Sequence, residues 1–201
     1  MRFIVSGLLF VGTAFLLPTA LEAQQQSTTA ESRPEIDLAV TYTAQRSNLT
    51  TSPIFWPQGA GVELSTIVYH GFGVAMNIAG THSSDISPLG QDLTMVTATF
   101  GPRYTWSHRI HGQPDKRINV FGQALIGIAF GLDSAFPSTS GLQSSADSFA
   151  LQIGGGVDLA FSRHFAVRPL QADWIRTQFP NATTGVQNNM RLSAGVVFRF
   201  P

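Results

Sequence analysis

The chain has 201 residues, enough for one domain, and its 12 acidic and 12 basic residues cancel. Only 12 % of the residues are charged, about half of the ~25 % usual in soluble domains, and Lys116 is the single lysine. The neutral balance gives no reason to expect nucleic acid as a partner, and the absence of cysteine excludes disulfides and Cys-based metal sites.

The first 23 residues have the pattern of an export signal. Arg2 is followed by an apolar run that ends in small residues, and we expect cleavage after Ala23. A transmembrane anchor is the alternative, but Ser, Gly and Pro interrupt the run. Residues 24–34 are polar and without periodicity, and we expect them to form a flexible leader.

Residues 35–201 are predicted to form one domain made of strands. Runs of about ten residues alternate between apolar and polar side chains, and Gly, Pro, Ser and Asn separate them. Pro169 requires a bulge near Arg168, because proline cannot donate to a central ladder. The eight predicted strands are 36–46, 60–69, 72–81, 93–106, 117–131, 149–161, 164–179 and 188–201.

The predicted connections alternate in length. Those at 70–71 and 162–163 are tight, whereas those at 47–59, 82–92 and 132–148 are long and polar. This asymmetry is typical of outer-membrane barrels, which have short turns on the periplasmic side and longer loops outside. We therefore expect both termini to be periplasmic.

Two eight-stranded up-and-down barrels fit the alternation: a soluble one and a transmembrane one. The polar faces are rich in small residues such as Gly73, Ala75 and Ser193, which suits a narrow lumen better than a solvated exterior. The apolar faces carry aromatic residues towards their ends, as interface girdles require. Tyr104, Trp106, Phe161, Phe165, Phe198 and Phe200 are expected near the periplasmic rim, and Phe130 and Trp174 near the outer rim. The sequence thus predicts an all-β, eight-stranded antiparallel transmembrane barrel in the outer membrane of a Gram-negative bacterium.

Four stretches carry a resemblance to a known family: "TFGPRYTW", "FGQALIGIAFG", "HFAVRPLQADWIRTQF" and "RLSAGVVFRF". With them the chain resembles the small outer-membrane β-barrel domain proteins of the OmpA/OmpX type over residues 35–201. The resemblance implies that Phe200 is the aromatic signal read by the outer-membrane assembly machinery, although Pro201 departs from the usual aromatic end. It also implies lipid and lipopolysaccharide as surroundings. Larger relatives append a peptidoglycan-binding domain, and none is expected here.

Charged residues on the inward faces are predicted to form an ion-pair network, because a buried charge must be paired. We expect this network to close the lumen, since eight strands leave room only for side chains. The alternative is a narrow gated pore for small solutes. The predicted members are Asp37, Glu63, Arg103, Asp158, Asp173, Arg191 and Arg199, with Arg168 at the bulge as a further candidate.

No enzyme activity, cofactor or metal site is expected. The histidines lie mostly at turns, whereas a metal site needs three or four converging ligands. A less favoured alternative is a lipid A-modifying hydrolase, for which "THSSD" offers His82, Ser83 or Ser84, and Asp85 as a set of base, nucleophile and a group that orients the base. A hydrolase would need these groups on separate, rigid elements.

The leading functional hypothesis is envelope maintenance or surface binding through the long loops, because binding usually resides on loops that a rigid scaffold presents. Those loops contain Asp85, Asp92, Asp133 and Asp147 and the aromatic residues Phe55 and Trp56. The sequence leaves the ligand and the oligomeric state open.

Overall fold

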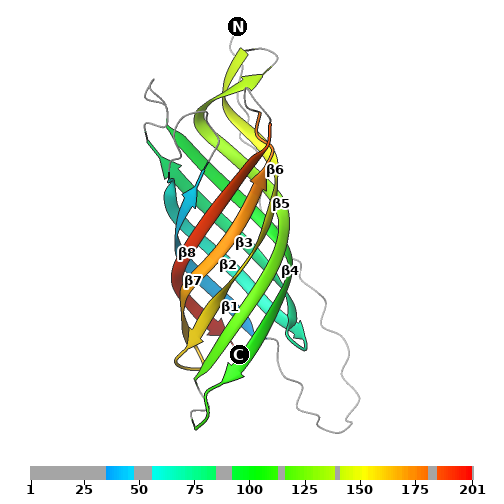
Figure 1. Ribbon diagram of the computed structural model, residues 1–201, viewed down its shortest axis with the longest axis vertical. Coiled ribbons are helices and arrows are strands. Elements are labelled where there is room, and N and C mark those ends of the chain that lie inside the picture. The colour runs from blue at the N-terminus through cyan, green and yellow to red at the C-terminus, as the bar shows by residue number, and fades with distance from the viewer. Residues whose placement is uncertain are drawn as a thin grey trace, which may run out of the picture. The chain divides into compact units, whose positions relative to one another are not determined.

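The computed structural model describes residues 35–47, 56–84, 92–112, 116–138, 141–180 and 185–200. The predicted signal peptide and leader lie outside these residues. Within them, eight strands form one closed barrel in sequence order (Figure 1). The strands are β1 (Ile36–Arg46), β2 (Gln58–Tyr69), β3 (Phe72–Ser83), β4 (Leu93–Arg109), β5 (Arg117–Ser138), β6 (Gly141–Ala160), β7 (Phe165–Thr177) and β8 (Gln187–Phe200).

Every neighbouring pair of strands is antiparallel, and β1 pairs with β8 to close the ring. The seam runs from Ile36 opposite Phe200 to Arg46 opposite Met190. This confirms the predicted eight-stranded antiparallel barrel. None of the described residues belongs to a helix long and apolar enough to cross a membrane.

Side chains alternate between the lumen and the outside, because successive residues of a strand point to opposite faces. On β1, Thr41 and Thr43 are buried in the lumen, whereas Val40 and Tyr42 are exposed on the outer surface. The same inversion holds around the ring: large apolar side chains are exposed on the outer surface, and charged side chains such as Glu63, Arg103 and Arg191 are buried in the lumen. A soluble protein shows the opposite distribution, so the outer surface is built for lipid.

The two ends of the barrel differ. At one end, which we call the turn end, β2 and β3 are joined by the two residues His70 and Gly71. Both have positive φ, at 45° and 87°, as the favoured two-residue hairpin turns require. A side chain on Gly71 would meet the carbonyl oxygen of Thr105 at 2.6 Å, so glycine is needed there.

At the opposite end, β5 and β6 extend beyond the other strands as a two-stranded ribbon (Figure 1). The ribbon comprises residues 132–138 and 141–148, and we call this end the ribbon end. The prediction of a loop over 132–148 is therefore wrong. The segment contains two Asp, one Pro and one Gly, which disfavour strands, among six Ser. Pairing between the two extended arms, from Leu132 with Ser145 to Ser138 with Gly141, overrides that preference.

Candidate functional site in the barrel lumen

The centre of the lumen holds two arginines and two acids, which four different strands direct inward. Glu63 comes from β2, Arg103 from β4, Asp158 from β6 and Arg168 from β7. Each is at most 4 % exposed. Each lies on the inward face of its strand, so the alternation that exposes apolar neighbours to lipid also buries these charges. We call these four residues the central cluster.

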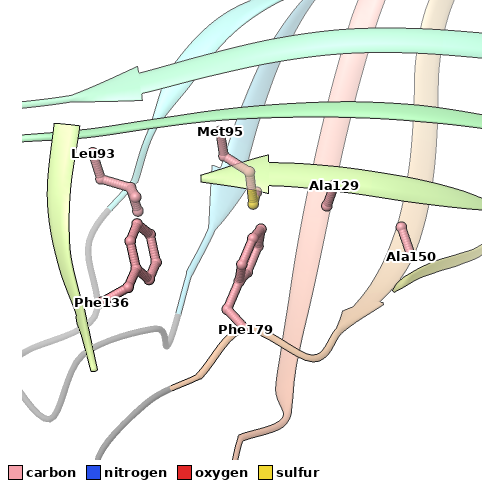
Figure 2. Packing of buried hydrophobic residues seen from close by; sticks show 6 residues of the cluster. All are labelled: Leu93, Met95, Ala129, Phe136, Ala150 and Phe179. Atoms are coloured by element: carbon pink, nitrogen blue, oxygen red, sulfur yellow. The ribbon is translucent and has the colours of Figure 1, made fainter. Parts of the chain in front are cut away.

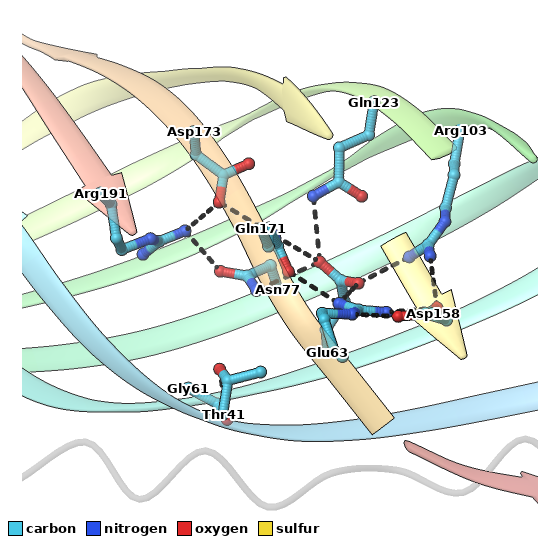
Figure 3. A network of polar contacts seen from close by, with 11 residues as sticks. Thr41, Gly61, Glu63, Asn77, Arg103, Gln123, Asp158, Gln171, Asp173 and Arg191 are labelled. Carbon is cyan, nitrogen blue, oxygen red and sulfur yellow. Dashed lines mark hydrogen bonds and ion pairs between the residues drawn. The ribbon is translucent and has the colours of Figure 1, made fainter. Parts of the chain in front are cut away.

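Each arginine of the central cluster contacts both acids. Arg168 forms two bonds to Asp158, from Nε to Oδ1 at 2.6 Å and from Nη2 to Oδ2 at 3.1 Å. Its Nη1 donates to Glu63 Oε1 at 2.7 Å. Arg103 Nη1 donates to the same Glu63 oxygen at 2.6 Å, and Arg103 Nη2 lies 3.6 Å from Asp158 Oδ2. Two positive and two negative charges thus form a closed, neutral ring of ion pairs across the lumen. Figure 3 shows part of this ring.

Neutral side chains complete the central cluster. The ring of Phe121 lies against both guanidinium groups, with its centroid 3.5 Å from Arg103 Cζ and 4.5 Å from Arg168 Cζ. Such cation–π contacts are strongest away from water. Gln123 Nε2 donates to Glu63 Oε2 at 3.0 Å, so the carboxylate has partners on both oxygens (Figure 3).

The bulge in β7 explains why Arg168 is central. The register with β8 shifts between Arg168 and Gln171, as Pro169 predicted. The bulge keeps Arg168 and Gln171 both inward although they are three positions apart, whereas strict alternation would separate them. Arg168 Nη1 then donates to Gln171 Oε1 at 2.7 Å. The sequence identified Arg168 only as a further candidate for the ion-pair network. It gave no reason to assign Phe121, Gln123 or Gln171 to that network.

A second ion pair lies nearer the ribbon end. Asp173 on β7 and Arg191 on β8 occupy opposite positions in the register, and their Oδ2 and Nη2 atoms are 3.8 Å apart. Arg191 Nη2 also donates to Asn77 Oδ1 at 3.0 Å, and its Nη1 donates to Thr97 Oγ1 at 3.2 Å (Figure 3 shows the first of these). These bonds hold the long Arg191 side chain across the lumen towards β3 and β4.

A third group of charges lies at the turn end. Arg199 Nε is 3.3 Å from Asp37 Oδ1 and 3.7 Å from Glu35 Oε1, and Glu35 also pairs with Arg117. The Arg199 guanidinium forms no hydrogen bond to any described protein group. A cavity of about 20 Å³, lined by Asp37 and Arg117 among others, lies beside this group. It has room for about one water molecule.

The lumen at the ribbon end is filled by apolar side chains (Figure 2). Phe136 and Phe179 lie with ring centroids 5.7 Å apart, and Gln187 holds the backbone of Phe179 by two hydrogen bonds of 2.9 and 3.0 Å. The sequence analysis missed this group, because Phe136 falls in the predicted loop. We call it the mouth plug: Leu93, Met95, Ala129, Phe136, Ala150 and Phe179.

The structure thus brings the seven predicted network residues into the lumen in three layers, and hydrogen bonds through Gln171 and Asn77 link the first two layers. Glu63, Arg103 and Asp158 meet in the central cluster, Asp173 and Arg191 form the second pair, and Asp37 and Arg199 the third. Phe200 is exposed at the end of β8, and Trp56 is exposed before β2. Phe55 and Asp85 lie outside the described residues, where the structure gives no information on them.

No three His, Asp or Glu side chains in the described part of the chain are grouped as metal ligands. His82 and Ser84 are exposed at the end of β3 and hydrogen-bonded to each other. The predicted girdle residues all face outward, from Phe165 at 36 % exposure to Trp106 at 60 %. At the turn end, Phe165 contacts Phe198 edge-on at 6.1 Å.

Comparison with known proteins gives a consistent result. The family model described as "Outer membrane protein beta-barrel domain" matches residues 13–200. The fold is similar to that of Ail, the attachment invasion locus protein of Yersinia pestis, with a TM-score of 0.51 and 17 % identity over 83 % of this chain and 99 % of that one. It is also similar to Neisserial surface protein A, with a TM-score of 0.53 and 12 % identity over 83 % and 97 % of the two chains. No curated protein matches in sequence.

Proposed function

The chain belongs to the outer membrane protein β-barrel domain family and is an outer-membrane barrel, and we propose that it is a closed scaffold whose ribbon end binds ligands outside the cell. The observation that supports this most directly is the filling of the lumen. Among the described residues, three layers of paired charge and the mouth plug occupy the lumen in turn, which supports a barrel without an open route through it. The exposed surface at the ribbon end is then what remains for recognition.

We further propose that the turn end faces the periplasm, with lipopolysaccharide around the ribbon end of the barrel. The short His70–Gly71 turn and the long ribbon support this orientation, because outer-membrane barrels have short periplasmic turns. Phe200, exposed at the end of β8, is the proposed assembly signal.

The chemistry of the ribbon indicates the class of ligand. Residues 132–148 contain Asp133 and Asp147, six serines and one threonine, and no basic residue. Of the similar proteins, Ail was also solved in complex with the heparin analogue sucrose octasulfate. A polyanion of that kind is not the ligand we expect here, because the ribbon has no positive charge to attract it. We expect a neutral or cationic partner that accepts and donates hydrogen bonds, such as an uncharged glycan.

Replacement of residues 134–146 by a two-residue Asn-Gly turn tests the proposal. The barrel should still fold, because the pairs that close the ring of eight strands do not involve these residues, although the mouth plug loses Phe136. Binding of whole cells to arrays of neutral and sulfated glycans is then measured for both forms. We expect the shortened form to lose binding to neutral glycans, with little binding of either form to sulfated ones. Equal binding by the two forms would contradict the ribbon as the binding surface.

The same strains test the alternative of envelope maintenance. Sensitivity to bile salts and uptake of a fluorescent dye report the integrity of the outer membrane. If the chain acts by binding, the shortened form should protect the envelope as well as the full chain does. Loss of envelope integrity without loss of glycan binding would favour the structural role instead.

A further inference from the structure

A polar set lies on the outer surface of the barrel at the ribbon end, on three neighbouring strands. His82 on β3 lies opposite Thr94 on β4, and Thr94 lies opposite Leu132 on β5, directly before Asp133. Ser84 follows β3 by one residue. We call Ser84, His82, Thr94 and Asp133 the rim set. None of these residues faces the lumen network described above.

Hydrogen bonds join the rim set into one chain. Ser84 Oγ is 3.3 Å from His82 Nε2, His82 Nδ1 is 2.9 Å from Thr94 Oγ1, and Thr94 Oγ1 is 3.0 Å from Asp133 Oδ2. The separation of the acid from the histidine by a hydroxyl is the unusual feature. The sequence suggested Asp85 as the acid, but Asp133 is the carboxylate that the structure connects to His82.

The carboxylate fixes the direction of every proton in this chain. An ionised Asp133 can only accept, so the single hydroxyl proton of Thr94 is donated to it. Thr94 Oγ1 must then accept from His82 Nδ1–H. In the neutral imidazole, His82 Nε2 then carries no proton and accepts from the hydroxyl of Ser84. A serine that donates to an imidazole held in this tautomer is the arrangement that activates a nucleophile.

The backbone around Asp133 supports this arrangement. Asp133 has a positive φ of 62°, and the β5–β6 register shifts between Leu132 and Phe136. Irregularities of this kind re-aim single side chains next to functional sites. Here the shift directs the Asp133 carboxylate sideways to β4. Regular alternation after the outward-facing Leu132 would instead point it into the lumen.

The position of the rim set along the barrel axis indicates the class of substrate. Ile78 on β3, Val96 on β4 and Phe130 on β5 face outward one or two pairs of residues closer to the barrel centre, and Ile78 and Phe130 are at least 40 % exposed. At the level of the rim set, polar side chains join exposed apolar ones such as Leu132 on the outer surface: Gln58 lies opposite His82 and accepts a hydrogen bond from Tyr42. The rim set therefore lies at the boundary between acyl chains and headgroups, which is where the ester bonds of membrane lipids are found.

We propose that the rim set is an esterase site for the acyl esters of membrane lipids, an activity beyond the scaffold role proposed above. Ser84 Oγ attacks the ester carbonyl while its proton passes to His82 Nε2. The bond from the carbonyl carbon to the alkoxy oxygen breaks, and His82 gives the proton to the departing alcohol. Water then attacks the acyl-serine and passes a proton through His82 back to Ser84, which releases the fatty acid. One ester and one water thus yield one acid and one alcohol.

The roles within the set differ. Ser84 and His82 touch the reacting atoms and are the catalytic residues of the proposal. Thr94 and Asp133 are positioning residues, because they act through the orientation and tautomer of His82.

Covalent labelling tests the nucleophile. The full chain, folded in detergent micelles, is treated with a fluorescent long-chain fluorophosphonate, and folding is checked by heat-modifiable migration on gels. We expect labelling of the wild type and of Ser83→Ala and no labelling of Ser84→Ala. Ser83 is a matched control because it is adjacent but belongs to the opposite face of β3. Equal labelling of wild type and folded Ser84→Ala would overturn the proposal.

Hydrolysis of three esters identifies the source of the acyl group: p-nitrophenyl laurate in micelles, phosphatidylethanolamine in vesicles, and purified lipopolysaccharide, with fatty acid measured by mass spectrometry. His82→Ala should lower the rate by about 10²–10⁴-fold, as expected for loss of a general base. Release from only one of the two lipids names that lipid as the substrate. The absence of release from all three esters by the folded wild type would show the proposal to be wrong.

The positioning role is tested at Thr94. Thr94→Val removes the hydroxyl that links His82 to Asp133, whereas Thr94→Ser retains it. We expect the valine variant to lose at least ten-fold in kcat with little change in KM, and the serine variant to recover it. A purely structural role of Thr94 predicts equal kcat for the two variants, and that result would remove Thr94 and Asp133 from the proposal.

Discussion

At the scale of single residues, Arg168 is the side chain on which most of the lumen charge depends. It contacts Asp158, Glu63 and Gln171 and is 1 % exposed. Removal of one partner from a buried ion pair leaves an uncompensated charge, which costs about 3–5 kcal/mol. We therefore expect Arg168→Met to lower the free energy of unfolding by about that amount, measured by urea titration in phospholipid vesicles.

Arg176→Met is the matched control for this prediction. Arg176 lies on the same strand, β7, but is exposed, so its loss should change the free energy of unfolding by at most about 1 kcal/mol. A further variant, with Arg168→Met and Asp158→Asn together, should recover part of the loss because Arg103 and Glu63 remain as a neutral ion pair. If the single and double variants were equally unstable, packing rather than charge would account for the effect.

At the scale of the strands, the outward faces set the position of the barrel in the lipid. Ile126 lies near the middle of the part of β5 that the ring encloses and is 49 % exposed. Arg at the bilayer midplane costs about 2–4 kcal/mol, so Ile126→Arg should reduce the free energy of unfolding in vesicles by that much.

Leu142→Arg provides the comparison, because Leu142 is 74 % exposed on the ribbon, beyond the ring. Leu142→Arg should lower the free energy of unfolding by only about 0–1 kcal/mol, because Arg costs little near or beyond the membrane interface. Equal costs at the two sites would mean that the assignment of the lipid-facing band is wrong.

The strands also show how far the sequence alone could lead. The period of two is enforced wherever one face meets lipid and the other the lumen, so β1 has its predicted bounds, Ile36–Arg46. Most of the ribbon obeys no such constraint, because apart from Phe136 and the residues next to the ring its described side chains are exposed. Its Ser-rich arms therefore look like a loop in the sequence, and only the pairing of Phe136 with Gln143 reveals a strand.

The candidate site was predictable only in part, for a related reason. Alternation indicates that a residue such as Glu63 points inward, and burial then demands a partner. It does not indicate which strand supplies that partner, because the arrangement across the lumen depends on the stagger of all eight strands. Arg168 and Glu63 are hydrogen-bonded although they are 105 residues apart in the sequence, and Asp133 and Thr94 although they are 39 residues apart.

At the scale of the whole molecule, the filled lumen predicts an electrically silent barrel. The central cluster and the mouth plug would both have to move before ions could pass. In planar bilayers we expect no steady single-channel current from the wild type. Brief openings should become more frequent only when Arg168→Ala is combined with Phe136→Ala and Phe179→Ala. Large, steady currents from the wild type would instead favour the narrow gated pore.

The pairing of β1 with β8 has a consequence for how the barrel folds. It joins Ile36 to Phe200, residues 164 positions apart (200 less 36). Bringing together chain ends so distant costs about 4–5 kcal/mol of entropy, and nothing is recovered until the final strand is in place. Until then β1 presents an unpaired edge, which hydrocarbon does not tolerate. The barrel therefore stays open until the fourteen residues of β8 pair with β1 and close the ring in one step.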